Sequence, residues 1–368
     1  MVNPLPASGI LPNQGVLPSQ TIRRMIADGQ ITADGAPEEQ IQPASLDLRL
    51  GFTAYRVRAS FLTGAGRTVA DRLSEFAMHE IDLSSGAVLE VGCVYVVPLQ
   101  EYLRLPADIS AVANAKSSTG RLDLFTRLIT DQGTEFDRID AGYEGPLYAE
   151  ISPRTFSVLV RPGARLNQIR FRRGESTYSD AELKTLHDTL KLVDGEAVID
   201  QGIGFSVDLT PRADGVVGWK ARRHTGLIDL DRIGHYNPDE FWAPVRHLGG
   251  SGVILDPGEF YILVSRESVH VPPECAAEMT PYLAMAGEFR VHYAGFFDPG
   301  FGHAAAGGAG SRGVLEVRCH EAPFALEHGQ VVGRLVYEPM AETPDKLYGA
   351  AMNSNYQGQG LKLAKQFR

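Results

Sequence analysis

The segment 113–124, ANAKSSTGRLDL, brings Lys116, Ser117, Ser118 and Arg121 together in a chain whose formal net charge is −10. Hydroxyl groups and the N–H groups at a helix start donate hydrogen bonds to phosphate oxygens, and cations balance the phosphate charge. Ser117 and Arg121 are four residues apart, so on a helix they would share one face and could contact the same anion. The segment therefore predicts a phosphate site, with a serine-capped surface turn and a solvated arginine as the alternative.

A carboxylate interrupts an apolar segment further along the chain, at Glu150 in PLYAEIS. In an apolar strand a carboxylate either pairs with a cation or has a raised pKa, as a general acid or base would. Ten residues earlier, Asp140 lies in RIDAGYEG, where a turn-forming role and a substrate contact both stay open. Glu150 is thus a candidate for proton transfer.

The chain contains two copies of one pattern. A short helical segment leads into QPASLDLRLG in the first half, and a second one, capped by Ser179, leads into GIGFSVDLTPR. Further on, LEVGCVYVVPL matches LDPGEFYILVS, and RIDAGYEG matches FFDPGFGH. We therefore predict two tandem domains, 1–174 and 175–345, each opening on a short helix. Residues 346–368 would form a tail that either orders over a ligand or frays.

The two copies differ in the residues that could do chemistry. TPYLAMAGEF in the second copy replaces NAKSSTGRLD, so the cations and the paired hydroxyls are lost. Glu316 in GVLEVRCH matches Glu150, which weakens the case that Glu150 alone is catalytic. An extra AAAGGAGS run before Glu316 favours its being a relic. The comparison predicts that only the first copy has an intact site.

Composition narrows the class of protein. The 39 glycines and 22 prolines favour many short strands and tight turns, which predicts a mainly β fold, either a barrel or a double-sheet jelly roll. No apolar run approaches the roughly 20 residues of a membrane span, and the N-terminus does not read as a signal peptide, so we expect a soluble, cytoplasmic protein. The three scattered cysteines argue against disulfides and structural zinc. The acidic balance argues against nucleic-acid binding, although 116–173 has ten Lys or Arg against seven Asp or Glu, which suits a small polyanion.

Five segments of the chain occur in a telling order: QPASLDLRLG, KSSTGR, RIDAGYEG with the following AE, LVRPG and NYQGQG. Together they resemble the dCTP deaminase family, which is close to the trimeric dUTPases. The resemblance implies a distorted jelly roll of the dUTPase-like fold in each copy, and a homo-oligomer built as a trimer or a multiple of a trimeric arrangement of domains. It also implies active sites at interfaces between domains, with the fused second copy replacing a neighbouring subunit at some of them. The implied reaction converts dCTP to dUTP and ammonia, with Mg²⁺ accompanying the triphosphate and no zinc. The sequence indeed lacks the H-x-E and P-C-x-x-C signature of zinc deaminases.

The resemblance also implies residue roles. Glu150 would be the catalytic base, while Ser117 and Arg121 would orient water, base and phosphates. Tyr143 would pack on the deoxyribose, and the tail would close over the triphosphate. The substrate-binding candidates are Lys116, Ser118, Arg138, Asp140, Tyr143, Tyr348, Tyr356 and Gln359, of which Tyr348 lies outside the five segments that carry the resemblance.

The sequence departs from the family pattern in several places. Lys116 stands where arginine is usual, which keeps the charge but loses the bidentate geometry. The segment between Arg121 and Asp140 is longer than usual, so the backbone that would read cytosine is not assigned. Two rival functions stay open beside deamination. One is a dUTPase, or a bifunctional enzyme that also converts dUTP to dUMP, with Asp140 as base; the other is a non-catalytic nucleotide sensor.

Overall fold

A computed structural model describes residues 13–33, 35, 37–174, 177–247, 252–281, 289–291, 295–349 and 358–368. The chain divides into two compact units. The N-terminal unit comprises residues 19–174, 222–241 and 364–368, and the C-terminal unit comprises 1–18, 175–221 and 242–363. Strands dominate both units, which confirms the prediction of a mainly β fold.

The N-terminal unit is built on two larger sheets and one small sheet. The first sheet has the order β13-β8-β10 with β3 on β13, the second has the order β5-β4-β7-β11-β9 with β2 on β7, and the third is β16-β12-β6. These strands are β2 (Ile31–Thr32), β3 (Leu46–Arg49), β4 (Thr53–Val57), β5 (Ala77–Asp82), β6 (Ala87–Leu89), β7 (Val94–Arg104), β8 (Ile109–Ala115), β9 (Leu124–Thr130), β10 (Arg138–Ile139), β11 (Glu144–Pro153), β12 (Val158–Val160), β13 (Arg165–Arg173) and β16 (Ile228–Asp229).

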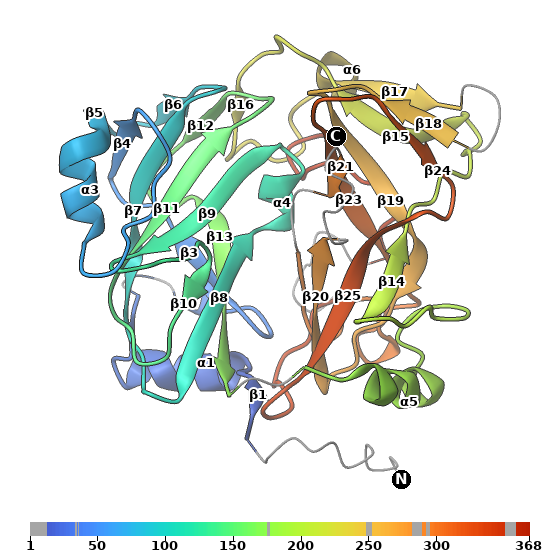
Figure 1. The fold of residues 1–368 in the computed structure, drawn as a ribbon, viewed down its shortest axis with the longest axis horizontal. Helices are drawn as coiled ribbons and strands as arrows, with labels where there is room; N and C mark the ends of the chain where they lie inside the picture. The colour runs from blue at the N-terminus through green and yellow to red at the C-terminus, as the bar shows by residue number, and fades with distance from the viewer. Residues whose placement is uncertain are drawn as a thin grey trace. The chain divides into compact units, whose positions relative to one another are not determined.

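Short helices connect these strands. Figure 1 shows α4 directly after β8, at the place where the sequence predicted a phosphate site. The helices of this unit are α1 (Ser19–Ala27), α2 (Pro37–Gln40), α3 (Val69–Phe76), α4 (Ser117–Gly120) and α6 (Pro238–Phe241).

The C-terminal unit repeats this plan. Its sheets have the orders β14-β25-β20-β22, β17-β15-β19-β23-β21 and β18-β24. Its elements are β1 (Gly15–Val16), α5 (Asp180–Leu190), β14 (Ile203–Ser206), β15 (Val216–Ala221), β17 (Trp242–Arg246), β18 (Gly252–Leu255), β19 (Phe260–Val269), β20 (Cys275–Pro281), β21 (Phe289–Val291), β22 (Phe296–Phe297), η2 (Ala304–Ala306), β23 (Ser311–Cys319), β24 (Phe324–Glu327) and β25 (Val331–Pro339). Ser179 caps α5 and accepts a hydrogen bond from the Glu182 N–H, as its sequence predicted.

The strand register reproduces the internal repeat residue by residue. Glu150 lies opposite Val96 of β7, and Glu316 lies opposite Ile262 of β19. A buried tyrosine precedes each of these two partners, Tyr95 in β7 and Tyr261 in β19. Each tyrosine hydroxyl accepts a hydrogen bond from a backbone N–H of the acidic turn before the strand, at 3.1 Å for Tyr95 and 2.9 Å for Tyr261. The sequence match of Glu150 with Glu316 therefore holds in three dimensions.

In the described part of the chain no helix is long and apolar enough to cross a membrane. The structure describes all three cysteines and none of them forms a disulfide; Cys275 and Cys319 are buried.

Candidate active site

The segment KSSTGR forms a single helical turn at the end of β8. Lys116 precedes the turn in an extended conformation, and the Arg121 N–H donates to the Ser117 carbonyl at 3.2 Å, so these two residues lie one turn apart as the spacing predicted. Arg121 is only 2 % exposed and ranks among the largest fully buried side chains. The alternative of a solvated surface arginine is therefore wrong.

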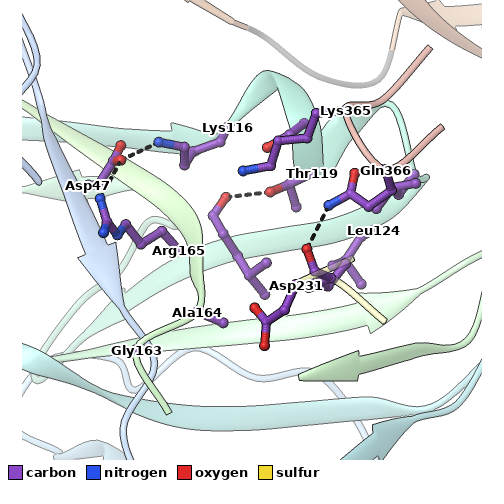
Figure 2. Close-up of a pocket in the computed structure, with 14 residues that line it drawn as sticks. Asp47, Lys116, Thr119, Leu124, Gly163, Ala164, Arg165, Asp231, Lys365 and Gln366 are labelled. Atoms are coloured by element: carbon purple, nitrogen blue, oxygen red, sulfur yellow. Dashed lines mark hydrogen bonds and ion pairs between the residues drawn. The ribbon is translucent and has the colours of Figure 1, made fainter. Parts of the chain in front are cut away.

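Two of the predicted residues, Lys116 and Ser118, line a pocket of about 350 Å³ in the N-terminal unit (Figure 2). This cavity, here called the Lys116 pocket, is also lined by Asp47 and Arg165. Lys116 forms an ion pair with the buried Asp47 carboxylate, and Arg165 Nη1 lies 3.9 Å from Asp47 Oδ2. The pocket thus presents cations and a hydroxyl, the groups that bind phosphate.

Glu150 lies on β11, between β7 and β9, and is 1 % exposed. Its Oε1 accepts hydrogen bonds from Arg127 Nη2 at 2.5 Å and from Arg127 Nε at 3.2 Å. Its Oε2 is buried and accepts no hydrogen bond from the residues that the structure describes. Of the two sequence-based alternatives for this carboxylate, pairing with a cation is the one the structure contains.

Sequence reasoning missed Arg127, which lies directly opposite Glu150 on β9. Its guanidinium stacks on Phe136, 3.5 Å from the ring centroid, and lies 4.7 Å from the centroid of Phe125. Its Nη2 also donates to Ser60 Oγ at 2.9 Å. The signal was present in FTRLIT, an apolar segment with one cation, which mirrors the single carboxylate of PLYAEIS.

Arg138, Asp140 and Tyr143 line a second cavity of about 540 Å³, here called the Tyr143 pocket. Arg138 Nε lies 3.3 Å from Asp140 Oδ1, and both side chains are largely exposed. Tyr143 donates its hydroxyl hydrogen to the Pro146 carbonyl at 2.7 Å and accepts the Asp131 N–H at 3.3 Å. Burial raises the pKa of this phenol well above its usual value. The hydroxyl therefore helps to hold the turn together.

The predicted residues thus fall into separate places in the N-terminal unit. Lys116 and Ser118 share one pocket, and Arg138, Asp140 and Tyr143 share the other. Ser117, Arg121 and Glu150 line neither of these two cavities.

Of the tail candidates, Tyr348 and Gln359 belong to the C-terminal unit. Tyr348 lies 5.7 Å from Phe301 between ring centroids, and Gln359 Nε2 donates to the Arg312 carbonyl at 3.0 Å. Tyr356 lies outside the described residues. Among the residues that the structure describes, no group of three or more His, Cys, Asp or Glu is arranged to hold a metal ion.

The N-terminal unit therefore combines a cationic, hydroxyl-lined pocket with a buried carboxylate that keeps one oxygen unpaired, which suits an enzyme acting on an anionic substrate by proton transfer. Family models agree with this class. The 2'-deoxycytidine 5'-triphosphate deaminase (DCD) N-terminal domain matches residues 13–175, and the C-terminal domain of the same family matches residues 179–367. The chain belongs to the 2'-deoxycytidine 5'-triphosphate deaminase family, as the sequence motifs indicated.

Individual relatives of the chain carry names from the same family. A "dCTP deaminase, dUMP-forming" from Sulfurihydrogenibium sp. is 30% identical over 158 residues, covering 42% of this chain and 82% of the relative. A "dCTP deaminase" from Natronomonas pharaonis is 29% identical over 155 residues, covering 41% of this chain and 76% of the relative. The crystal structure of 2'-deoxycytidine 5'-triphosphate deaminase from Agrobacterium tumefaciens is 57% identical, with a TM-score of 0.86, over 89% of this chain and 99% of that chain.

Proposed function

We propose that this protein deaminates dCTP hydrolytically to dUTP and ammonia without zinc, with Glu150 activating the water. The observation that carries the proposal is the asymmetry of this carboxylate. Oε1 is held by Arg127, and Oε2 is buried with no hydrogen-bond donor in the described part of the chain. An oriented carboxylate with one oxygen available is what a general base needs. The family membership of the chain and the names of its relatives support the same reaction.

The proposed step balances as follows. The water oxygen bonds to C4 of cytosine while Glu150 Oε2 accepts one proton from that water. N3 ends with one of the two water protons, and the exocyclic amine receives the other and leaves as ammonia when the C4–N bond breaks. Positioned acid–base groups of this kind typically contribute about 10²- to 10⁴-fold in rate.

The other candidate residues would bind and orient the substrate. Lys116 and Ser118 would contact the phosphates in the Lys116 pocket, and Ser117 and Arg121 would orient water and base edge from the adjoining turn. Arg138, Asp140 and Tyr143 would contact sugar and base, while the tail residues Tyr348, Tyr356 and Gln359 would close over the triphosphate. Since Lys116 and Ser118 line one pocket and Arg138, Asp140 and Tyr143 line another, we propose that a complete site joins groups from different domains of an oligomer with trimer-like symmetry. Each domain would be a distorted jelly roll of the dUTPase-like fold.

Mg²⁺ would enter with the triphosphate and balance its charge. Asp47 and Asp231, the two carboxylates of the Lys116 pocket, already form ion pairs with protein cations. The ligands of the cation would therefore be phosphate oxygens and water, which Mg²⁺ commonly retains.

A second candidate function is a bifunctional enzyme that also converts dUTP and water to dUMP and pyrophosphate. Its support is the name "dCTP deaminase, dUMP-forming" carried by several relatives. Asp140, exposed at the Tyr143 pocket, would then be the base that activates water for attack on phosphorus.

The test is ammonia release and product identity with purified protein, Mg²⁺ and dCTP, beside CTP and dUTP. We expect ammonia from dCTP, with dUTP as product for a monofunctional enzyme or dUMP and pyrophosphate for a bifunctional one. E150Q should lose at least about 10²-fold in rate while it still binds dCTP. E80Q, the same change at an exposed position of β5, is the matched control and should stay active. No ammonia from the wild type would refute the function, and full activity of E150Q would refute the mechanism.

A further inference from the structure

Two polar side chains of β11, Glu150 and Ser152, each bury an oxygen that has no hydrogen-bond partner among the residues that the structure describes. These oxygens are Glu150 Oε2 and Ser152 Oγ. The two residues are 1 % and 2 % exposed, so bulk water does not reach either side chain freely. A buried polar atom without a partner costs free energy, and it commonly marks the place of a bound water or ligand.

The pleat of the strand places Glu150 and Ser152 on the same face of the sheet. Successive side chains of a strand alternate between its two faces, so residues two apart share a face. On the neighbouring strand β9, Arg127 lies opposite Glu150. In the next row along, Phe125 lies opposite Ser152. The serine therefore lies beside the proposed base, one row further along β11.

The separation of the two side chains suits one water molecule. Residues two apart on a strand are separated by about 6.6 Å along its axis. A water that forms one hydrogen bond to each of two oxygens spans up to about 5.6 Å between them. Arg127 already holds Oε1 of Glu150 at 2.5 Å, so Oε2 is the oxygen left for the water.

The residues around the pair are mainly apolar. Val96 of β7, opposite Glu150, is completely buried, and Phe125 of β9 lies opposite Ser152. A buried water needs two to four polar partners. Since the strand offers two such atoms beside apolar neighbours, a water there would hold one defined position.

The second copy provides an internal comparison. Glu316 on β23 corresponds to Glu150, and Arg318, two residues further on, corresponds to Ser152. Arg318 Nη1 donates to the Gly258 carbonyl at 2.5 Å. A long cationic side chain thus replaces the small hydroxyl in the copy that has lost the KSSTGR motif. The pairing of a glutamate with a serine two residues later is confined to the copy that keeps this motif.

We propose that Ser152 is a water-positioning residue that holds the attacking water against Glu150 Oε2. The inference rests on the proposed function, because it names a further group of the same reaction. Glu150 Oε2 would accept one proton of this water as the water oxygen bonds to C4. The Ser152 hydroxyl would form a second hydrogen bond to the water and would be unchanged at the end of the reaction. Together the two contacts would direct a lone pair of the water at the substrate.

Steady-state deamination of dCTP by S152A and S152T is the first test. S152A should lower kcat by about tenfold, the loss usual for one hydrogen bond. KM should stay within about twofold, because Ser152 would contact the water and not dCTP. S152T keeps a hydroxyl and should recover most of the rate. A hydroxyl with a structural role alone would change the free energy of unfolding and leave kcat unchanged.

The matched control is S84A, the same change at an exposed serine in the turn after β5, which should keep the kcat of the wild type. If S152A does not fold, S152C takes its place, because a thiol has a similar volume but is a weak hydrogen-bonding group.

A crystal structure that shows ordered waters separates this inference from the proposed function, because it requires no turnover. We expect one water within hydrogen-bond distance of both Glu150 Oε2 and Ser152 Oγ in the wild type, and its loss in S152A. This water, with no ammonia released by the wild type, would support the water site and refute the function. An S152A variant with the kcat of the wild type, or a wild-type structure in which no water joins the two oxygens, would overturn the role of Ser152.

Discussion

Replacing Arg127 by methionine should destabilise the N-terminal unit more than replacing Glu150 by glutamine. Methionine keeps much of the apolar stem but leaves the Glu150 carboxylate, whose side chain is 2 % exposed, without its counter-charge. Glutamine leaves the arginine charged, but that side chain is 25 % exposed and stays stacked on Phe136. The two changes therefore remove the same ion pair with unequal consequences.

The expected loss in the free energy of unfolding follows from how deeply the Arg127 and Glu150 side chains are buried. Removing one partner of a buried ion pair typically costs about 3–5 kcal/mol, and the partial exposure of Arg127 favours the lower end, about 3 kcal/mol for R127M. E150Q should cost about 1–2 kcal/mol, because the arginine can regain water and still meets an amide oxygen. The double variant leaves no unpaired buried charge. Its loss should be smaller than the sum of the single losses by about 2 kcal/mol.

Urea unfolding followed by circular dichroism measures these losses. Both tryptophans, Trp219 and Trp242, belong to the C-terminal unit, so their fluorescence follows that unit separately. Additive losses, or an R127M variant as stable as the wild type, would refute the view that Arg127 neutralises Glu150. The result bears directly on catalysis, because Arg127 is the group that holds one oxygen of the proposed base.

Three further predictions concern other parts of the chain. In the folded protein a thiol reagent should modify Cys93 quickly, while the buried Cys275 and Cys319 should react only on unfolding, which mass spectrometry of the modified protein would check. Burial raises the pKa of the Cys275 thiol from 9.0 to about 12, so on raising the pH the unfolded chain loses this proton before the folded protein does. Between those two pH values the contribution of the thiol to the free energy of unfolding therefore falls by about 1.4 kcal/mol per pH unit. The urea midpoint should consequently fall less steeply with pH in C275A than in the wild type. G302A should lower the free energy of unfolding far more than G307A. Both glycines have positive φ, but an added Cβ at Gly302 would lie 2.0 Å from a backbone oxygen, whereas the space beside Gly307 is open. Equal losses of stability in the two variants would contradict this reasoning.

Local chemistry and repetition were readable from the sequence. KSSTGR forms the expected turn because its signals are short-range: a serine pair, a glycine and a four-residue spacing. The two copies align because each keeps a tyrosine and a glutamate at the same register on paired strands. Such positions depend on the period of two along a strand, which survives in sequence.

The pairing of Arg127 with Glu150 was not readable, because it depends on the register between β9 and β11 across a long connection. That connection contains Arg138, Asp140 and the whole Tyr143 turn, and its length offers no signal that places position 127 opposite 150. The C-terminal segment, residues 346–368, is rich in polar residues and glycine, which predicts no particular partner. Its backbone carbonyls nevertheless accept hydrogen bonds from the N–H groups of residues 234–236. Contacts between segments so distant along the chain are set by tertiary packing.

The acidic residue beside the KSSTGR turn has a counterpart in the second copy, where a different cation pairs with it. Asp47 in SLDL corresponds to Asp208 in SVDL, and each is a mostly buried carboxylate that needs a cation. In the first copy Lys116 supplies that cation. In the second copy Thr280 corresponds to Lys116, and Arg312 from β23 pairs with Asp208 instead.

Each of these buried carboxylates therefore requires a cation for its charge, and that cation can come from different segments of the fold. In the N-terminal unit the ion pair with Asp47 occupies part of the charge of Lys116, which leaves less of it to balance a triphosphate. A phosphate subsite built on Lys116 alone would be weak for that reason.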